Sequence, residues 1–149
     1  MIKQRKNNGR KTEKAIYKAA RNEPFAKNLG MTLVDLALGY SRVEMTYHAD
    51  KMDNIYQRDP WRGIYSLIDE AFGNLLPDPW GYRRGLNVNV SYTASPEPGA
   101  RLIAEARKSR SKKIAHYDIS VTDDAGQLIA TAKTIAFRTG KPIPFYDKS

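Results

Sequence analysis

One stretch in the middle of the chain constrains the fold more than any other, because its apolar residues recur at helical spacing. Six of them lie three or four positions apart, on one face of a helix over about Trp61–Leu76. They are Ile64, Leu67, Ile68, Ala71, Phe72 and Leu75. Pro77 and Pro79 are expected to end this helix, since proline cannot continue the helical hydrogen bonding. The chain must therefore bury one long, strongly apolar helix face.

The segments around this helix alternate between apolar and polar residues, which is the period of a half-buried strand. Six strands are expected, at Met31–Leu38, Ser41–Tyr47, Gly85–Ala94, Arg101–Ser109, Lys113–Thr122 and Gln127–Arg138. We expect the last four to form a meander. An antiparallel sheet of six strands with a single apolar helix has to cover that helix with one of its faces. The sequence therefore predicts an α+β fold with the sheet wrapped around the helix.

The positive charge of the chain is concentrated at its N-terminus. The net charge is +9 at pH 7, and residues 1–21 alone hold eight Lys or Arg against one Glu, a net +7. We expect a disordered basic tail over residues 1–11 and a single domain over residues 12–149. Within that domain a short helix is expected from Thr12 to Arg21, followed by a helical turn from Pro24 that ends at Gly30.

Composition excludes several kinds of site. The chain has no cysteine, so disulfides, thiolate catalysis and cysteine-bound metals are excluded. Two histidines, His48 and His116, do not suffice for a multi-histidine metal centre, and we expect both to be structural or exposed. No apolar run reaches 18 residues, and no apolar segment follows the basic N-terminus as a secretory signal requires. We expect a cytoplasmic protein with no membrane span, no metal and no cofactor of its own.

Six short motifs, taken in order, resemble one known family. They are Pro24–Met31, Gly39–Val43, Leu67–Gly73, Leu86–Tyr92, Pro98–Ala106 and Asp124–Ala132. Together they resemble the hot-dog thioesterase superfamily, in particular its phenylacetic-acid-pathway-type branch, over about residues 24–140. The resemblance implies the hot-dog fold, in which an antiparallel six-stranded sheet wraps around one long central helix. It also implies assembly as a homodimer or a dimer of dimers.

The resemblance assigns catalytic roles on and just before the helix. The family's helix aspartate, which acts as base or nucleophile, corresponds to Asp69, and Glu70 is the fallback base. Asn54 corresponds to the asparagine that opens the family's active-site loop, and Gly63 could present a backbone N–H to the thioester carbonyl. Each position has a structural alternative. Asp69 could be a solvated or ion-paired helix acid, Gly63 an ordinary first-turn residue, and Asn54 a loop residue that caps backbone groups.

The sequence departs from the family at one motif. Members of this branch usually carry His-Gly-Gly before the helix, whereas the corresponding positions here are Pro60, Trp61 and Arg62. The active site is therefore expected to be atypical. The aromatic residues around the lost motif would close part of the acyl tunnel or form a floor for the acyl group, or else serve as core or interface residues. They are Tyr56, Trp61 and Tyr65.

CoA carries several phosphates, so basic residues are expected at the mouth of the pocket. The first candidates are Arg110, Lys112 and Lys113 in one turn, with a solvated basic turn as the alternative. The second candidates are Arg83 and Arg84, which precede a strand. The sequence thus predicts an acyl-CoA thioesterase that uses a helix carboxylate. The alternative is a hot-dog protein that binds acyl-CoA or another apolar ligand without turnover.

A third hypothesis is that the basic tail contacts nucleic acid or a membrane surface. The charge of the rest of the chain argues against this hypothesis, because the 128 residues after residue 21 carry a net charge of only +2. They also contain no recognised nucleic-acid motif. We therefore expect no specific nucleic-acid partner.

Overall fold

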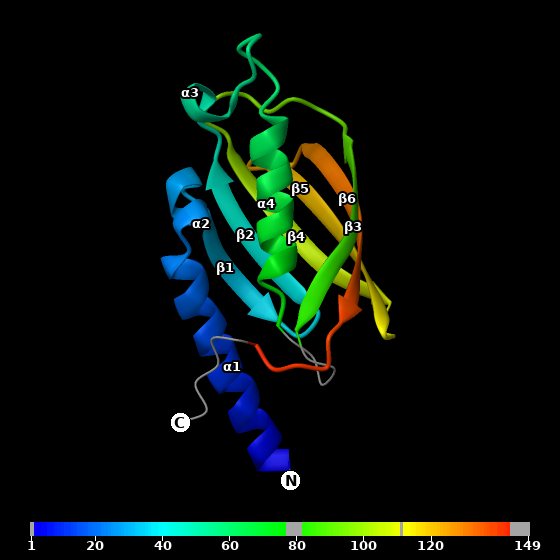
Figure 1. Cartoon of the computed structure of the whole chain (residues 1–149). Coiled ribbons are helices and arrows are strands. Elements are labelled where there is room, and N and C mark those ends of the chain that lie inside the picture. Colours follow the sequence, from blue (N-terminus) through cyan, green and yellow to red (C-terminus); the bar gives the residue numbers. More distant parts are fainter. Residues whose placement is uncertain (1, 77–81, 111, 144–149) are drawn as a thin grey trace.

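In the computed structural model, which describes residues 2–76, 82–110 and 112–143, a curved sheet holds one helix in its concave face (Figure 1). The helices are α1 (Ile2–Asn22), α2 (Pro24–Leu29), α3 (Ala49–Met52) and α4 (Trp61–Gly73). The strands are β1 (Thr32–Ala37), β2 (Tyr40–Thr46), β3 (Arg83–Tyr92), β4 (Arg101–Arg110), β5 (Ile114–Asp123) and β6 (Leu128–Arg138). The predicted α+β class and the six-stranded antiparallel sheet are confirmed.

The order of the strands differs from the prediction. The sheet runs β1-β2-β4-β5-β6-β3, with every neighbouring pair antiparallel. The predicted four-stranded meander is wrong, because only β4, β5 and β6 follow one another, while β3 pairs with β6 at the far edge. Alternating polarity identifies a strand but not its neighbour. The segment between β3 and β4 carries the chain back so that β4 pairs with β2.

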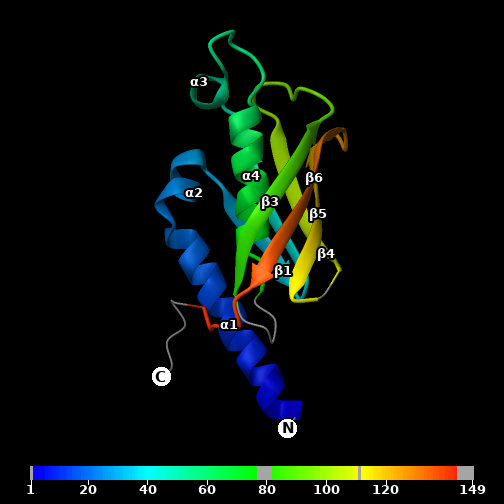
Figure 2. The same ribbon diagram turned by 45° about the vertical axis from the view of Figure 1, so that its right-hand side comes forward.

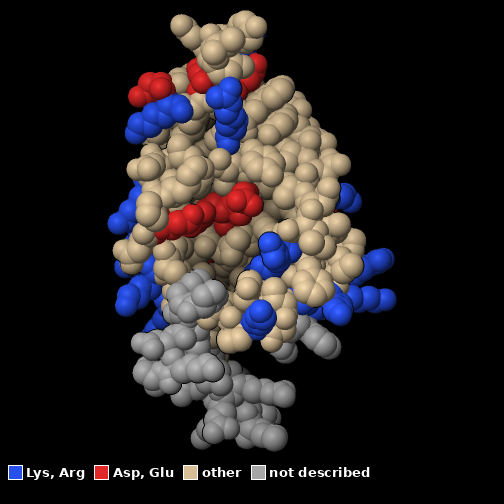
Figure 3. Space-filling view, viewed as in Figure 1, with Lys and Arg blue, Asp and Glu red and all other residues tan. Residues whose placement is uncertain are grey.

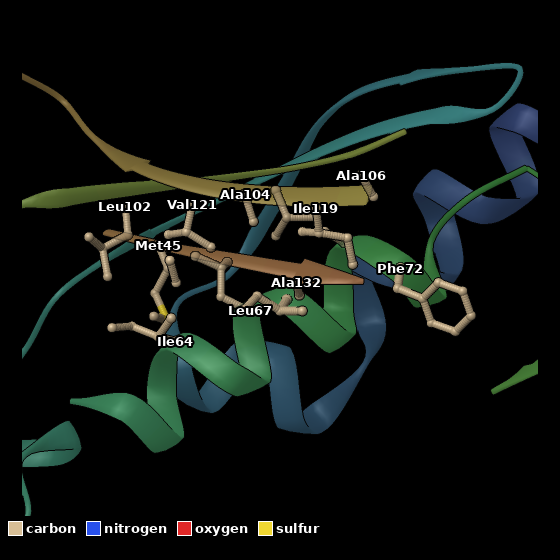
Figure 4. Close-up of a cluster of buried hydrophobic side chains, with 14 of the residues drawn as sticks. Met45, Ile64, Leu67, Phe72, Leu102, Ala104, Ala106, Ile119, Val121 and Ala132 are labelled. Carbon is tan, nitrogen blue, oxygen red and sulfur yellow. The ribbon is translucent and has the colours of Figure 1, made fainter. Parts of the chain in front are cut away.

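The predicted apolar stripe of α4 forms the centre of the core. All six of its residues are buried, from Ile64 at the start of the helix to Leu75 just after its end. They face inward-pointing side chains of the sheet such as Met45, Leu102 and Val121 (Figure 4). Many sheet positions under the helix are small, and this lets the helix approach the strands closely. These are Ala104, Ala106, Ala115, Ala130, Ala132 and Ala136, all buried.

A buried polar contact ties the helix to the sheet. Ser41 on β2 is fully buried, and its hydroxyl donates a hydrogen bond to the carbonyl oxygen of Ala71 on α4. A buried hydroxyl without a partner would be destabilising, so this bond favours one position of α4 along β2.

The N-terminal helix is longer than the sequence suggests. Residues 2–11, predicted to be disordered, belong to α1, which begins at Ile2 and not at Thr12. Lys, Gln and Arg are good helix formers, so a polar composition does not exclude a helix. The C-terminal half of α1 packs against β1, while its N-terminal half extends beyond the sheet (Figures 1 and 2). The turn of helix at α2 is confirmed, and Gly30 ends it at a φ of 68°.

Two further differences concern the segment around α4. The short helix α3 forms within residues 48–62, which the sequence indicated as loop, and α4 ends at Gly73. The prolines expected to end it, Pro77 and Pro79, lie outside the described residues. Across the residues that the structure describes, no helix is long and apolar enough to cross a membrane.

Candidate active site

The two helix carboxyls lie at a cavity beside the C-terminal half of α4. The cavity has a volume of about 610 Å³, within the range of small-molecule sites. Its walls come from the end of α1, from α4 and from the start of β3. In the space-filling view, acidic atoms cross a hollow in the middle of this face (Figure 3). Asp69, Glu70 and Glu23 are the acidic residues of its lining.

Asp69 presents a free carboxylate to this cavity. It directly follows the buried Ile68, and a turn of about 100° per residue places it at the border of the apolar face. Partial burial raises the pKa of Asp69 above its ordinary value of 3.8. Within the described parts of the chain, its carboxylate has neither an ion-pair nor a hydrogen-bond partner. The ion-paired alternative for Asp69 therefore receives no support from the structure, whereas its exposed side chain is what the solvated alternative expects.

Glu70 lines the same cavity, but its carboxyl, unlike that of Asp69, has a hydrogen-bond partner. Its carboxyl accepts a hydrogen bond of 2.8 Å from the side-chain amide of Asn74, one turn further along α4. Burial raises the pKa of Glu70 to about 7, and the carboxyls of Glu23 and Asp69 also raise it, against the lowering effect of Asn74. Glu70 is therefore a partly protonated acid near neutral pH, whereas Asp69 is the free acceptor.

Replacing Glu70 by glutamine is expected to stabilise the protein at pH 8 and to leave its stability at pH 4 nearly unchanged. Between the ordinary pKa of 4.5 and the folded value of about 7, the folded state holds more protons than the unfolded state. The free energy of unfolding therefore falls as pH rises through this window. With solvent screening at this half-buried site, the expected gain at pH 8 is about 1–2 kcal/mol, or about 2–8 °C in Tm.

Thermal unfolding followed by circular dichroism at the two pH values measures this effect. The exposed Glu97→Gln serves as the matched control and should show no pH-dependent gain. An equal shift at pH 4 and pH 8 would contradict the titration of Glu70 and would point to altered packing instead.

Asn54 lies at the opposite end of α4 and caps its own loop. Its side-chain oxygen accepts hydrogen bonds from the backbone N–H of Tyr56 (2.9 Å) and of Arg58 (3.4 Å). This is the structural alternative considered for this asparagine. Asn54 does not belong to the lining of the cavity at Asp69.

Gly63, in the first turn of α4, is buried against α3. A Cβ atom at this position would lie 3.1 Å from the sulfur of Met52, so glycine permits the close packing of α3 on α4. In the described structure, the backbone N–H groups of Arg62 and Gly63 have no acceptor, whereas Trp61 and Ile64 donate to the carbonyls of Asp59 and Pro60. The start of α4 thus offers free N–H donors together with the positive end of the helix dipole.

These donors and Asp69 do not meet within one chain. Gly63 and Asp69 are six positions apart on α4, which corresponds to about 9 Å along the helix axis. Of the four predicted catalytic residues, the structure brings Asp69 and Glu70 together at the cavity and leaves Asn54 and Gly63 at the other end.

Four of the five basic candidates lie outside this cavity as well. Arg110 borders a polar groove on the outer face of the sheet, and the amino group of Lys113 lies 5.6 Å from the ring centroid of Phe137. Arg84 pairs with Phe137 in the β3–β6 register, and Lys112 is an exposed turn residue. No described contact brings these four residues to Asp69.

Arg83, and not Arg84, faces the cavity. A bulge between Gly85 and Asn87 shifts the alternation of β3 by one residue, so that Arg83 and Gly85 point inward together with Val88. The guanidinium of Arg83 donates hydrogen bonds to the carbonyls of Leu75 and Leu76, the latter at 2.8 Å. Simple alternation in the sequence cannot show such a bulge.

The aromatic residues near the missing His-Gly-Gly form an exposed surface. Trp61 stacks on Tyr92 of β3 with ring centroids 4.7 Å apart, and 44% of Trp61 remains exposed. Tyr65 is 43% exposed on the same helix, and Leu86 on β3 is 55% exposed. Tyr56 is exposed in the loop between α3 and α4. These four exposed side chains do not belong to the core; Trp61 and Tyr65 lie on α4, and Leu86 lies on the edge strand β3.

The end of α1 is the part of the site that sequence reasoning missed. Asn22 and Glu23 line the cavity next to Asp69 and Glu70, and Ile16 and Ala19 form its apolar wall. Only the packing of α1 against β1 brings these residues to α4, and no local pattern in the sequence signals it. Among the described residues, no three His, Cys, Asp or Glu side chains group as ligands for a metal ion.

No protein-family model matches the chain, and no similar curated protein was found. Solved structures do match it. The E. coli PaaI protein from the phenylacetic acid degradation operon superposes with a TM-score of 0.80 at 22% identity, over 90% of this chain and 97% of that one. A mutant of the phenylacetic acid degradation protein PaaI from Thermus thermophilus gives 0.70 at 29% identity, over 78% and 99%.

A third solved structure contains the ligand that the sequence analysis expects. A hypothetical thioesterase from Streptococcus pneumoniae, solved with coenzyme A, superposes with a TM-score of 0.68 at 15% identity, over 75% of this chain and 90% of that one. The chain therefore has the hot-dog fold, in the arrangement found in PaaI-type thioesterases.

Proposed function

We propose that the protein is an acyl-CoA thioesterase in which the carboxylate of Asp69 acts as general base or nucleophile. The observation that carries this proposal is the exposed Asp69 carboxylate, which lines a cavity and has no ion-pair or hydrogen-bond partner within the described structure. The similarity to a thioesterase solved with coenzyme A supports the choice of substrate.

As general base, Asp69 accepts a proton from a water molecule while the water oxygen bonds to the thioester carbon. The resulting tetrahedral oxyanion needs hydrogen-bond donors, which contribute strongly to catalysis of acyl transfer. Collapse of this intermediate breaks the C–S bond, and the CoA thiolate takes up the proton to leave as a thiol beside the free acid. If Asp69 acts as nucleophile, its carboxylate oxygen bonds to the thioester carbon, the C–S bond breaks and the CoA thiolate leaves. Water then hydrolyses the resulting mixed anhydride, which releases the free acid and restores the Asp69 carboxylate.

The oxyanion donors are proposed to come from a second copy of the chain. The free N–H groups at the start of α4 are too far from Asp69 in one subunit, while β3 is an edge strand beside the exposed side chains of Trp61, Tyr65 and Leu86. A two-fold pairing at this surface would bury those side chains and set the start of one α4 against the Asp69 of the other. A homodimer is the minimal assembly, and a dimer of dimers is compatible with it.

Arg84, Arg110, Lys112 and Lys113 remain the proposed contacts for the phosphates of CoA. They lie at the end of the sheet where β3, β5 and β6 meet and on its outer face, near the edge that would join two subunits. The nucleotide end of CoA would run over this surface while the thioester enters between the subunits. Guanidinium and ammonium groups suit phosphate oxygens at such exposed positions.

Binding without turnover is the second candidate. Its motivation is the replacement of the family's His-Gly-Gly by Pro60, Trp61 and Arg62, which removes a histidine and adds bulk at the start of α4. On this hypothesis the cavity and its aromatic rim hold acyl-CoA or another apolar ligand, and Asp69 has no chemical role.

A panel of acyl-CoAs, monitored with a thiol-trapping reagent and in parallel by native mass spectrometry, separates the two candidates. Release of free CoA well above the uncatalysed rate is expected for at least one acyl-CoA. Binding of acyl-CoA without release of CoA would favour the second candidate. If no acyl-CoA of the panel binds and none is hydrolysed, both candidate functions are excluded.

A further inference from the structure

We propose that the cavity between α1 and α4 holds the acyl group, and that it selects uncharged acyl chains whose length is limited by α1. This inference rests on the proposed function and specifies its substrate. Asp69 lines this cavity together with apolar residues of α1 and α4, so an acyl chain attached to the reacting carbonyl would have an apolar side along which to extend.

The end wall of this cavity is formed by small or apolar residues. On the α1 side it consists of Ile16, which is 4% exposed, together with Ala19 and Ala20. On the α4 side, Phe72 and Gly73 line the space, and an added Cβ at Gly73 would meet no atom within 4 Å. Small residues on both walls leave room for methylene groups, while the backbone of α1 sets the limit to chain length.

The charges around the cavity disfavour a second carboxylate on the acyl group. Glu23, Asp69 and Glu70 all line it, and the C-terminal end of α4 contributes the negative pole of a helix dipole. The guanidinium of Arg83, the one cation among the described lining residues, donates hydrogen bonds to the carbonyls of Leu75 and Leu76, and its single positive charge opposes only part of the charge of the three carboxyls. An acyl chain with a terminal carboxylate would therefore meet like charges in a partly desolvated space.

Filling the cavity tests the length limit. Gly73→Leu and Ala19→Leu are expected to lower kcat/KM for the longest acyl-CoA that the protein accepts by about tenfold or more, and to change it little for acetyl-CoA. The exposed Lys14→Leu, on the same helix as Ala19 but outside the cavity, is the matched control. Unchanged length profiles in both cavity variants, with folding intact, would overturn the inference.

A pair of substrates of equal length tests the charge selection. Hexanoyl-CoA and adipyl-CoA have the same number of acyl carbons, and only adipyl-CoA ends in a carboxylate. We expect kcat/KM to be about tenfold or more lower for adipyl-CoA, and Glu23→Gln to narrow this difference. Equal turnover of the two substrates would contradict the inference.

Calorimetry with the same acyl-CoAs separates failure of this inference from failure of the proposed function. The protein could bind hexanoyl-CoA more tightly than CoA without hydrolysing it, and Gly73→Leu could abolish this difference in affinity. That result would support the acyl cavity and reject only the enzymatic proposal. Hydrolysis that depends on Asp69 but is unaffected by either cavity variant would support the proposed thioesterase function and reject the acyl cavity.

Discussion

Asp69→Asn is expected to lower kcat/KM for acyl-CoA hydrolysis by about 10²–10⁴-fold, the usual contribution of a positioned general base. Asparagine has nearly the same shape and keeps a polar group at the cavity, but it cannot accept a proton from water. Because this carboxylate has no hydrogen-bond or ion-pair partner in the described structure, its loss should cost little stability. Continuous assay of released thiol gives the rate, and thermal unfolding verifies the fold.

Two further variants make this result specific. Glu70→Gln should retain most activity, because Glu70 is bonded to Asn74 and stays partly protonated near neutral pH. Asp124→Asn, in the exposed turn between β5 and β6, should behave as the wild type. Full activity in Asp69→Asn combined with inactivity in Glu70→Gln would move the catalytic role to Glu70. Full activity in both would reject a helix carboxylate as catalyst.

The pH dependence provides an independent check on Asp69. Catalysis needs its ionised form, and partial burial raises its pKa above the ordinary value of 3.8. The rate should therefore decline in acid at a higher pH than an aspartate with the ordinary pKa would give. A profile that is flat down to about pH 4, near the ordinary pKa of an aspartate, would conflict with a role for this carboxylate.

The fold was largely predictable because its central constraint is local. Positions 64, 67, 68, 71, 72 and 75 repeat at helical spacing within one segment, and every one of them is buried in the core. Strand neighbours depend on contacts between distant segments, which local alternation does not record. This is why the strands themselves were predicted while the position of β3 beside β6 was not.

The candidate site was predictable only where a single polar residue interrupts an apolar segment of the sequence. Asp69 interrupts an apolar stretch, and the structure places it at a cavity. The sequence does not distinguish Arg83 from Arg84, because the bulge at Gly85 leaves no signature in the alternation of β3. Asn22 and Glu23 were missed because they reach the cavity through the packing of α1, a tertiary contact.

The double variant Leu86→Lys/Tyr65→Lys is expected to convert a homodimer to monomers and to lower hydrolysis by about 10²–10³-fold, the usual cost of losing one oxyanion donor. Each substitution puts a charge on the exposed surface between α4 and β3, and two-fold symmetry would double the number of such charges in one dimer. Because the oxyanion donors are proposed to come from the partner's α4, separating the subunits should remove them.

Light scattering coupled to size exclusion measures the first effect as a fall from twice the chain mass to the single-chain mass of 16.9 kDa. Leu38→Lys is the matched control, since Leu38 is 71% exposed in the turn between β1 and β2, away from this surface. A monomeric double variant with full activity would show that one chain carries a complete site. A wild-type protein that is already monomeric would reject the proposed pairing. The backbone N–H groups of Arg62 and Gly63 would then lie near no Asp69 carboxylate of a second subunit and could not act as its oxyanion donors.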